Sequence, residues 1–173
     1  DRMAFGIEHG NEKFRAEMLD RRWSNSNIIE KVKIPKKYGV KFSVNNITGF
    51  PKETKEIMDE SANYMRTLNV DWYNLCLANS LPGTDMTTQF EEMGALEKDD
   101  EDHWETSSTY AYLSKNALNN KALVLSPEEM KDFIYSLNLE LNFVNNYNLR
   151  EGLYKRAIQL FKEVVEVSPL HVF

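Results

Sequence analysis

The sequence predicts an α/β fold in which parallel strands alternate with helices, followed by a helical C-terminal part. Three short segments rich in apolar and β-branched residues, at about 3–8, 40–48 and 70–78, read as strands. The segments between them place apolar residues at helical spacing. Strands separated by helices of this length form right-handed βαβ units and therefore a parallel sheet. A length of 173 residues fits one domain, or one domain with an appendage.

The first strand and helix have clear local signals. The strand at 3–8 closes at Gly10. A helix over 11–19 follows, with Phe14 and Met18 four residues apart on one face.

The next helix and strand are marked by their ends. Ser24 or Asn25 can cap a helix that extends to about residue 38. Pro35 lies inside this helix and predicts a kink or an early end there. Gly39 stops it, and 40–48 is the second strand.

A third helix, over about 52–68, precedes the third strand at 70–78. Its inward face is Ile57, Met58, Ala62, Met65 and Leu68. Pro82-Gly83 predicts a turn, and Thr84 caps a short helix that carries Met86, Phe90 and Met93.

The last third of the chain reads as helical. Ser126-Pro127-Glu128-Glu129 is a strong helix start, with a Ser cap, Pro at the first position and Glu at the third. A final helix is expected over about 149–167. An acidic run at 97–105 reads as a solvated linker; a metal-binding acidic loop is the alternative, although the EF-hand pattern is absent. The predicted division is therefore 1–95, 96–125 (acidic linker) and 126–173 (helical extension).

Composition excludes several classes of protein. The net charge of −6 argues against a broad surface for nucleic acid or anionic membranes. No apolar stretch approaches the roughly 18 residues of a membrane span, and no secretory signal is visible, which predicts a cytoplasmic protein. The single cysteine, Cys76, excludes an internal disulfide and any metal site built from several thiolates of this chain. Cys76 itself reads as a small buried hydrophobe.

Ligands of parallel α/β sheets bind at the carboxyl ends of the strands, so candidate residues are sought there. Glu8 ends the first strand, and as a carboxylate it can accept from a hydroxyl or an amine, although a solvent-facing loop acid is the alternative. Asn45 and Asn46 lie near the end of the second strand, where Asn is unusual; backbone satisfaction is the alternative to a ligand. His9, beside Glu8, could act as an acid or base or be structural.

Arg21 and Arg22 follow the first helix, and either could pair with a carboxylate or simply be solvated. The third strand ends in small residues and a turn, which lets a flat ring approach the backbone. Each of these signals is weak alone.

Four short motifs at these positions follow one another in a fixed order. They are Gly6-Ile7-Glu8-His9-Gly10-Asn11-Glu12, Leu19-Asp20-Arg21-Arg22 with Ser24-Asn25 before Ile28-Ile29, Asn45-Asn46-Ile47-Thr48-Gly49-Phe50-Pro51-Lys52-Glu53-Thr54, and Ser80-Leu81-Pro82-Gly83-Thr84. Together they resemble the radical S-adenosylmethionine (SAM) superfamily over about residues 3–95. The resemblance is closest to the class whose members often carry a cobalamin-binding domain ahead of the radical domain.

The resemblance implies a fold and a set of SAM contacts. The fold is a partial (β/α)₆ TIM-like barrel, of which this chain would supply the second half, the family's strands four to six. In the family, a polar residue of strand four and a following Arg contact the ribose and the methionyl carboxylate. Strand five gives a polar side chain to the ribose and an apolar one to the adenine, and strand six offers backbone to the adenine. Carried over by position, these residues are Glu8, Arg21, Asn45, Ile47 and Ala78. Arg22 is the rival of Arg21, because the register of this motif can shift by one residue.

The chain also departs from the family pattern. The CxxxCxxC loop that binds a 4Fe-4S cluster and the Gly-Gly-Glu stretch that binds the methionine amine are absent. Both belong to the first half of the barrel, so the resemblance implies cluster ligands outside this chain. His9 stands where many relatives have Ser, Lys52 where many have Gly, and Pro35 where relatives run a regular helix.

The resemblance therefore implies a longer radical SAM enzyme that cleaves SAM to a 5′-deoxyadenosyl radical, with this chain inert alone. The missing N-terminal half of the barrel would be its partner, pairing with the open edge of the first strand. The substrate stays open. One alternative is a non-catalytic α/β module that binds a partner through that edge. Another is an unrelated α/β enzyme that uses Glu8 and His9 as an acid/base pair.

Overall fold

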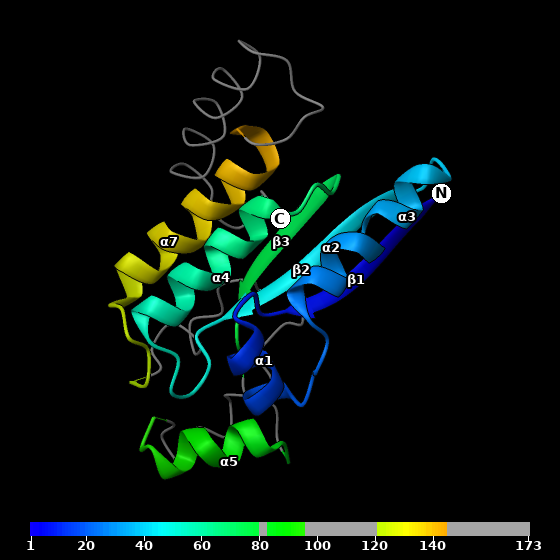
Figure 1. Ribbon diagram of the computed structural model, residues 1–173. Coiled ribbons are helices and arrows are strands. Elements are labelled where there is room, and N and C mark those ends of the chain that lie inside the picture. Colours follow the sequence, from blue (N-terminus) through cyan, green and yellow to red (C-terminus); the bar gives the residue numbers. More distant parts are fainter. Residues whose placement is uncertain (80–82, 96–120, 145–173) are drawn as a thin grey trace.

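A three-stranded parallel sheet organises the computed structural model, which describes residues 1–79, 83–95 and 121–144. Its strands are β1 (Arg2–Glu8), β2 (Lys41–Thr48) and β3 (Trp72–Leu77), in the order β1-β2-β3 (Figure 1). The predicted α/β fold with a parallel sheet is confirmed. The (β/α)₆ barrel and the three-part division of the chain stay predictions. The acidic run at 97–105 and the helix expected at 149–167 lie outside the described residues.

The helices between β1 and β2 begin where capping side chains occur. Asn11 caps α1 (Glu12–Leu19), and Ser24 rather than Asn25 caps α2 (Asn25–Lys31). The expected single helix to residue 38 is divided, because α2 ends at Lys31 and α3 (Lys33–Lys37) follows. Pro35 lies in the first turn of α3, where a helix needs no backbone N–H from it.

Two of the remaining helices start at the predicted caps. Thr84 caps α5 (Asp85–Glu92) as predicted, whereas α4 (Lys55–Thr67) begins three residues later than expected, after its cap Thr54. The structure bears out the strong start signal of α7 (Pro127–Leu139): Ser126 Oγ accepts from Glu129 N–H while the Glu129 carboxylate accepts from Ser126 N–H. A π-helical turn, η2 (Glu140–Val144), continues α7. Met93, expected on the apolar face of α5, follows that helix and is 44% exposed.

The main core lies on one face of the sheet. Side chains that alternate along the strands meet α2, α4 and α7 there, which is the burial expected for amphipathic helices on a sheet. The fully buried members include Ile7, Val44, Met58, Met65, Leu75, Met130, Ile134 and Leu141. In Figure 1, α4 and α7 run side by side next to β3, and α2 and α3 lie along β1 and β2.

The two edges of the sheet differ. At the β3 edge, the side-chain amides of Asn138 and Asn142 hydrogen-bond to the backbone of Leu75 and Tyr73. At the other edge, Asp1 C=O accepts from Lys41 N–H, so the odd-numbered residues of β1 direct their backbone groups to β2. Up to the register shift after Gly6, the even-numbered residues of β1 therefore direct theirs outward, and β1 is an edge strand of the described sheet.

Candidate functional site

The candidate site lies on the face of the sheet opposite the main core. There Gly6, Asn45 and Asn74 stand in register across the three strands, and Ile47 pairs with Cys76 one step further on. All five are partly exposed. A parallel sheet is normally covered on both faces and reads as nearly continuous apolar strands. A polar, partly exposed face is therefore a place where a ligand or further chain can bind.

Glu8 ends β1 in a strained conformation. Its φ is 69°, in the left-handed region that a residue other than glycine seldom adopts, and the register of β1 with β2 shifts between Gly6 and Glu8. The Glu8 side chain folds back over Gly6, since a Cβ built on Gly6 would lie 2.1 Å from Glu8 Oε1. Such strain persists where the surroundings impose it and clusters at functional sites.

Arg21 is the charged partner of Glu8. Arg21 Nη2 lies 3.4 Å from Glu8 Oε1, and Arg21 Nη1 donates to Gly6 C=O at 3.2 Å. Burial raises the pKa of the Glu8 carboxyl, and the nearby Arg21 charge opposes that rise without cancelling it. Arg22, the rival position, is exposed and pairs with Asp20 at 2.8 Å. The structure thus brings Arg21, and not Arg22, to Glu8.

The other three predicted residues lie on neighbouring strands at the same end of the sheet. Asn45 accepts a hydrogen bond from Asn74 Nδ2 at 2.9 Å. Ile47 packs in a small apolar cluster that includes the buried Ala78, and Ala78 N–H donates to Thr48 C=O at 2.7 Å. The structure therefore places Glu8 with Arg21, and Ile47 with Ala78. Asn45 lies between them on the central strand, in register with Gly6.

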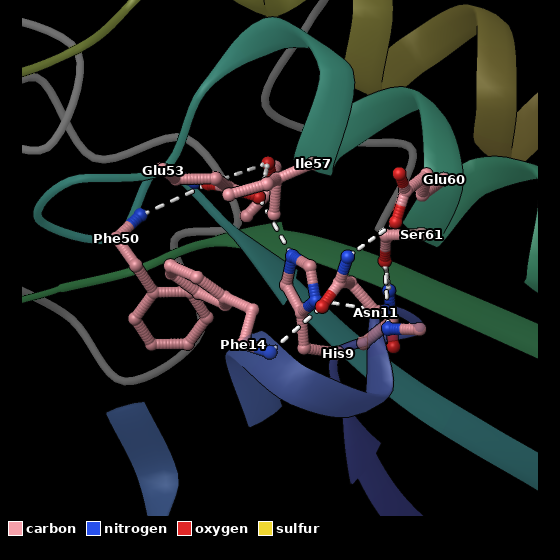
Figure 2. A network of polar contacts seen from close by, with 12 residues as sticks. His9, Asn11, Phe14, Phe50, Glu53, Ile57, Glu60 and Ser61 are labelled. Atoms are coloured by element: carbon pink, nitrogen blue, oxygen red, sulfur yellow. Dashed lines mark hydrogen bonds and ion pairs between the residues drawn. The ribbon is translucent and has the colours of Figure 1, made fainter. Parts of the chain in front are cut away.

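A buried polar network beside the site has no counterpart in the sequence-based prediction. His9 is fully buried, and its Nδ1 accepts from Asn11 N–H at 3.1 Å, so Nε2 carries the proton that is donated to Glu53 Oε1 at 2.8 Å (Figure 2). Glu53 also accepts from Thr48 Oγ1 at 3.0 Å and from Phe50 N–H at 3.1 Å. One carboxylate thereby fixes the turn after β2 to the loop after β1.

This geometry bears on the alternative of a Glu8–His9 acid/base pair. The His9 ring is held by Glu53 and Asn11 and lies against Phe14, with ring centroids 4.7 Å apart. Its side chain is inaccessible to solvent. A general acid or base has to reach the substrate, so His9 is placed for a structural role.

Arg15 is a second residue that sequence reasoning missed. It is fully buried and donates to His9 C=O at 2.6 Å and to Asn25 Oδ1 at 2.9 Å, and burial lowers its pKa. Among the described residues, its Nε atom has no hydrogen-bond partner. Arg15 is an ordinary-looking charge in an amphipathic helix, so no local pattern distinguishes it from a solvated arginine.

Cys76 faces the candidate site. The sequence predicts a buried residue, but Cys76 is only partly buried. Its Sγ donates to Asn46 C=O at 3.6 Å, and burial together with the Glu8 charge raises its pKa to about 11. Across residues 1–79, 83–95 and 121–144, no group of three or more His, Cys, Asp or Glu side chains could hold a metal ion. Within the same ranges, no helix is long and apolar enough to cross a bilayer.

Comparison with known proteins gives a partial match. No family model matches the chain. An uncharacterized methyltransferase of Pyrococcus horikoshii is 30% identical over 80 residues. The match covers 46% of this chain and 17% of the relative, so the matched part of the chain spans about a sixth of that protein's length.

Proposed function

We propose that the partly exposed sheet face opposite the main core binds SAM and that the chain forms part of a radical SAM enzyme. This face carries Gly6, Asn45, Ile47, Asn74 and Cys76 and is called the uncovered face below, with reference to the described residues. The observation that carries this proposal is the meeting of Glu8 and Arg21 at 3.4 Å, at the carboxyl end of β1. Two residues 13 positions apart were assigned to one ligand from their motifs, and they are in contact. The similarity to a methyltransferase supports an enzyme role related to SAM.

The residues present fit SAM in their chemistry. Glu8 is a partly buried acceptor for a ribose hydroxyl, and Arg21 is a cation within reach of the methionyl carboxylate. Asn45 adds a polar group on the central strand, and Ile47 with Ala78 supplies an apolar surface for the adenine. These residues bind and orient the molecule.

The residues of this chain do not fit a 4Fe-4S cluster, because the sequence has one cysteine and a cluster needs several thiolates. In this proposal the cluster ligands belong to the first half of the barrel, outside this chain. The reaction, whether methyl transfer or another radical C–H functionalisation, and any use of cobalamin depend on that other part. The chain alone is then catalytically inert.

The test is SAM binding by the full chain, measured by calorimetry with Glu8→Ala, Arg21→Ala and Arg22→Ala variants. Losing a hydrogen bond to a charged group costs about 1.5–3 kcal/mol, so Glu8→Ala and Arg21→Ala should weaken SAM binding by about tenfold or more. Arg22→Ala is the matched control and should bind like the wild type. Equal effects of the two arginine variants, or wild-type affinity in Glu8→Ala, would contradict the proposal.

The open edge of β1 favours a second candidate, a non-catalytic module that pairs with a partner strand. The β3 edge is closed by Asn138 and Asn142, whereas Ala4 directs its backbone N–H outward from β1. Ala4→Pro removes that donor without touching the β1–β2 ladder. Under this second function, Ala4→Pro abolishes partner binding and Glu8→Ala leaves it unchanged. Under the SAM proposal, the same edge joins the other half of the barrel and Glu8→Ala weakens SAM binding.

A further inference from the structure

A chain of side-chain hydrogen bonds crosses the uncovered face from β3 to β2. Trp72 Nε1 donates to Asn74 Oδ1 at 2.9 Å, and Asn74 Nδ2 donates to Asn45 Oδ1 at 2.9 Å. Trp72 and Asn74 are two residues apart on β3 and so share a face of the sheet. Asn74 is the register partner of Asn45. The line of contacts therefore ends on a residue of the proposed SAM site.

The direction of this chain is fixed by its first member. An indole N–H can only donate, so the amide of Asn74 has to turn its oxygen towards Trp72. Its nitrogen then faces Asn45 and has to donate, so Asn45 receives that bond with its oxygen. The two N–H donors of Asn45 Nδ2 are left for the open face. The indole N–H of Trp72 thus determines, through Asn74, that Asn45 directs its N–H donors and not its oxygen to the open face.

Trp72 is itself held in place. Its indole ring meets the ring of Phe143 on η2 edge to face, with centroids 6.0 Å apart and planes at 83°. That is a favoured geometry for an aromatic pair. Although Trp72 is 40% exposed, its indole is in contact with Phe143 and hydrogen-bonded to Asn74, and both contacts favour the observed orientation.

We propose that Trp72 and Asn74 are positioning residues that turn Asn45 so that its N–H donors face the ligand. The inference rests on the proposed function and adds the polarity of the site, that is, which side of it donates hydrogen bonds to the ligand and which side accepts them. Glu8 accepts and Asn45 donates, on neighbouring strands with Gly6 between them as the register partner of Asn45. A vicinal diol meets both demands, because one hydroxyl donates to the carboxylate while its neighbour accepts from the amide.

The variant Asn74→Asp reverses this polarity. The new carboxylate still accepts from the indole of Trp72 but has no proton to give to Asn45. Asn45 then turns its own N–H towards the carboxylate and presents its oxygen to the ligand. SAM affinity, measured by calorimetry on the full chain, should fall about tenfold in Asn74→Asp and about threefold in Trp72→Phe. Asn27→Asp adds the same charge at an exposed position on α2 and should leave the affinity unchanged.

A second readout needs no ligand. In the wild type, solvent exchange of side-chain N–H protons should be slow for the indole of Trp72 and for one proton of Asn74, and fast for both protons of Asn45. In Asn74→Asp, one proton of Asn45 should become protected. NMR of the ¹⁵N-labelled chain measures all of these signals, and thermal unfolding confirms that each variant folds.

The two measurements separate the two proposals. If the wild type binds no SAM, the proposed function fails, and the exchange pattern alone decides the orientation of Asn45. If the wild type and Asn74→Asp bind SAM equally, the positioning role is overturned while SAM binding stands. Protected Asn45 protons in the wild type, or no change of them in Asn74→Asp, overturn the assigned polarity.

Discussion

The side-chain amide of Asn138 hydrogen-bonds to both backbone groups of Leu75, 63 residues earlier in the chain. Its Oδ1 accepts from Leu75 N–H at 3.0 Å and its Nδ2 donates to Leu75 C=O at 2.9 Å. Asn142, one helical turn later, makes the same pair of bonds with Tyr73. The two amides supply what a neighbouring strand would supply, so β3 is closed as an edge by a helix.

This arrangement predicts a large loss of stability in Asn138→Leu. The substitution leaves the buried N–H and C=O of Leu75 without partners, which should lower the free energy of unfolding by about 2–4 kcal/mol. Urea unfolding followed by circular dichroism measures the loss. Ser136→Leu places the same side chain at an exposed position of α7 and should change stability by less than about 0.5 kcal/mol. Similar losses in both variants would mean that the amide bonds contribute little.

Substitution of the buried Glu53 carboxylate should lower the stability of the protein about as much as Asn138→Leu. The carboxylate is buried and accepts from His9 Nε2, Thr48 Oγ1 and the turn after β2. In Glu53→Gln one acceptor becomes a donor that faces other donors, so the free energy of unfolding should fall by about 2–4 kcal/mol. The exposed Glu30→Gln on α2 is the matched control. Equal urea midpoints for Glu53→Gln and the wild type would show that the network is not needed for folding.

The turn after β2 carries backbone strain at Lys52. Its φ is 63°, in the left-handed region that favours glycine, and many members of the family that the chain resembles have Gly at this position. Lys52→Gly should raise the free energy of unfolding by about 0.5–1 kcal/mol, because glycine adopts this conformation without a Cβ clash. Lys52→Ala keeps the Cβ atom and should give no such gain. Thermal unfolding of the three proteins compares them, and a stabilising Lys52→Ala would contradict the explanation.

Local signals predicted the elements of this fold well. Ser24, Thr84 and Ser126 each cap the helix that the sequence places after them. Asn11 and Thr54 cap helices whose expected starts, at about residues 11 and 52, lie slightly too early. Capping and apolar spacing act within a few residues, and a single sequence contains that information in full. Pro35 predicts only a kink or an early end at its own position, whereas the structure divides this helix at Val32.

Long-range polar contacts could not be predicted in this way. Glu53 and His9 are 44 residues apart, and Asn138 and Leu75 are 63 apart. Nothing in the neighbourhood of Glu53 or Asn138 distinguishes it from a surface residue, because the partner is defined only by the folded topology. The resemblance to a family assigns Glu8 and Arg21 to different groups of one ligand, and nothing in their spacing predicts that the two side chains are in contact.

The pH dependence of stability should report the burial of Glu8. Its pKa is raised above the ordinary value of 4.5, so the folded state holds the proton more tightly than the unfolded state. The resulting stabilisation is fully present below the ordinary pKa and is lost as the pH rises through the raised pKa. Glu8→Gln removes this loss and should therefore gain stability relative to the wild type from acidic to neutral pH.

Urea unfolding of Glu8→Gln and the wild type across that range measures the effect. Glu30→Gln, with an exposed carboxyl in the wild type, should follow the wild-type curve. If the wild type instead gains stability relative to Glu8→Gln as the pH rises, the Arg21 charge outweighs burial and the predicted sign is wrong.

The thiol of Cys76 offers a direct probe of the candidate site. Burial, and secondarily the charge of Glu8, raises its pKa to about 11, so at pH 8 only about one molecule in a thousand carries the thiolate. Alkylation by iodoacetamide should therefore be slow and should rise about tenfold per pH unit up to that pKa. Glu8→Gln removes the negative charge and should shift the whole profile to lower pH. Because Cys76 shares the uncovered face with Ile47, bound SAM should slow the reaction in the wild type. A rate that levels off near pH 8.5, as for an exposed cysteine, would show that this face is more open than the burial of Cys76 implies.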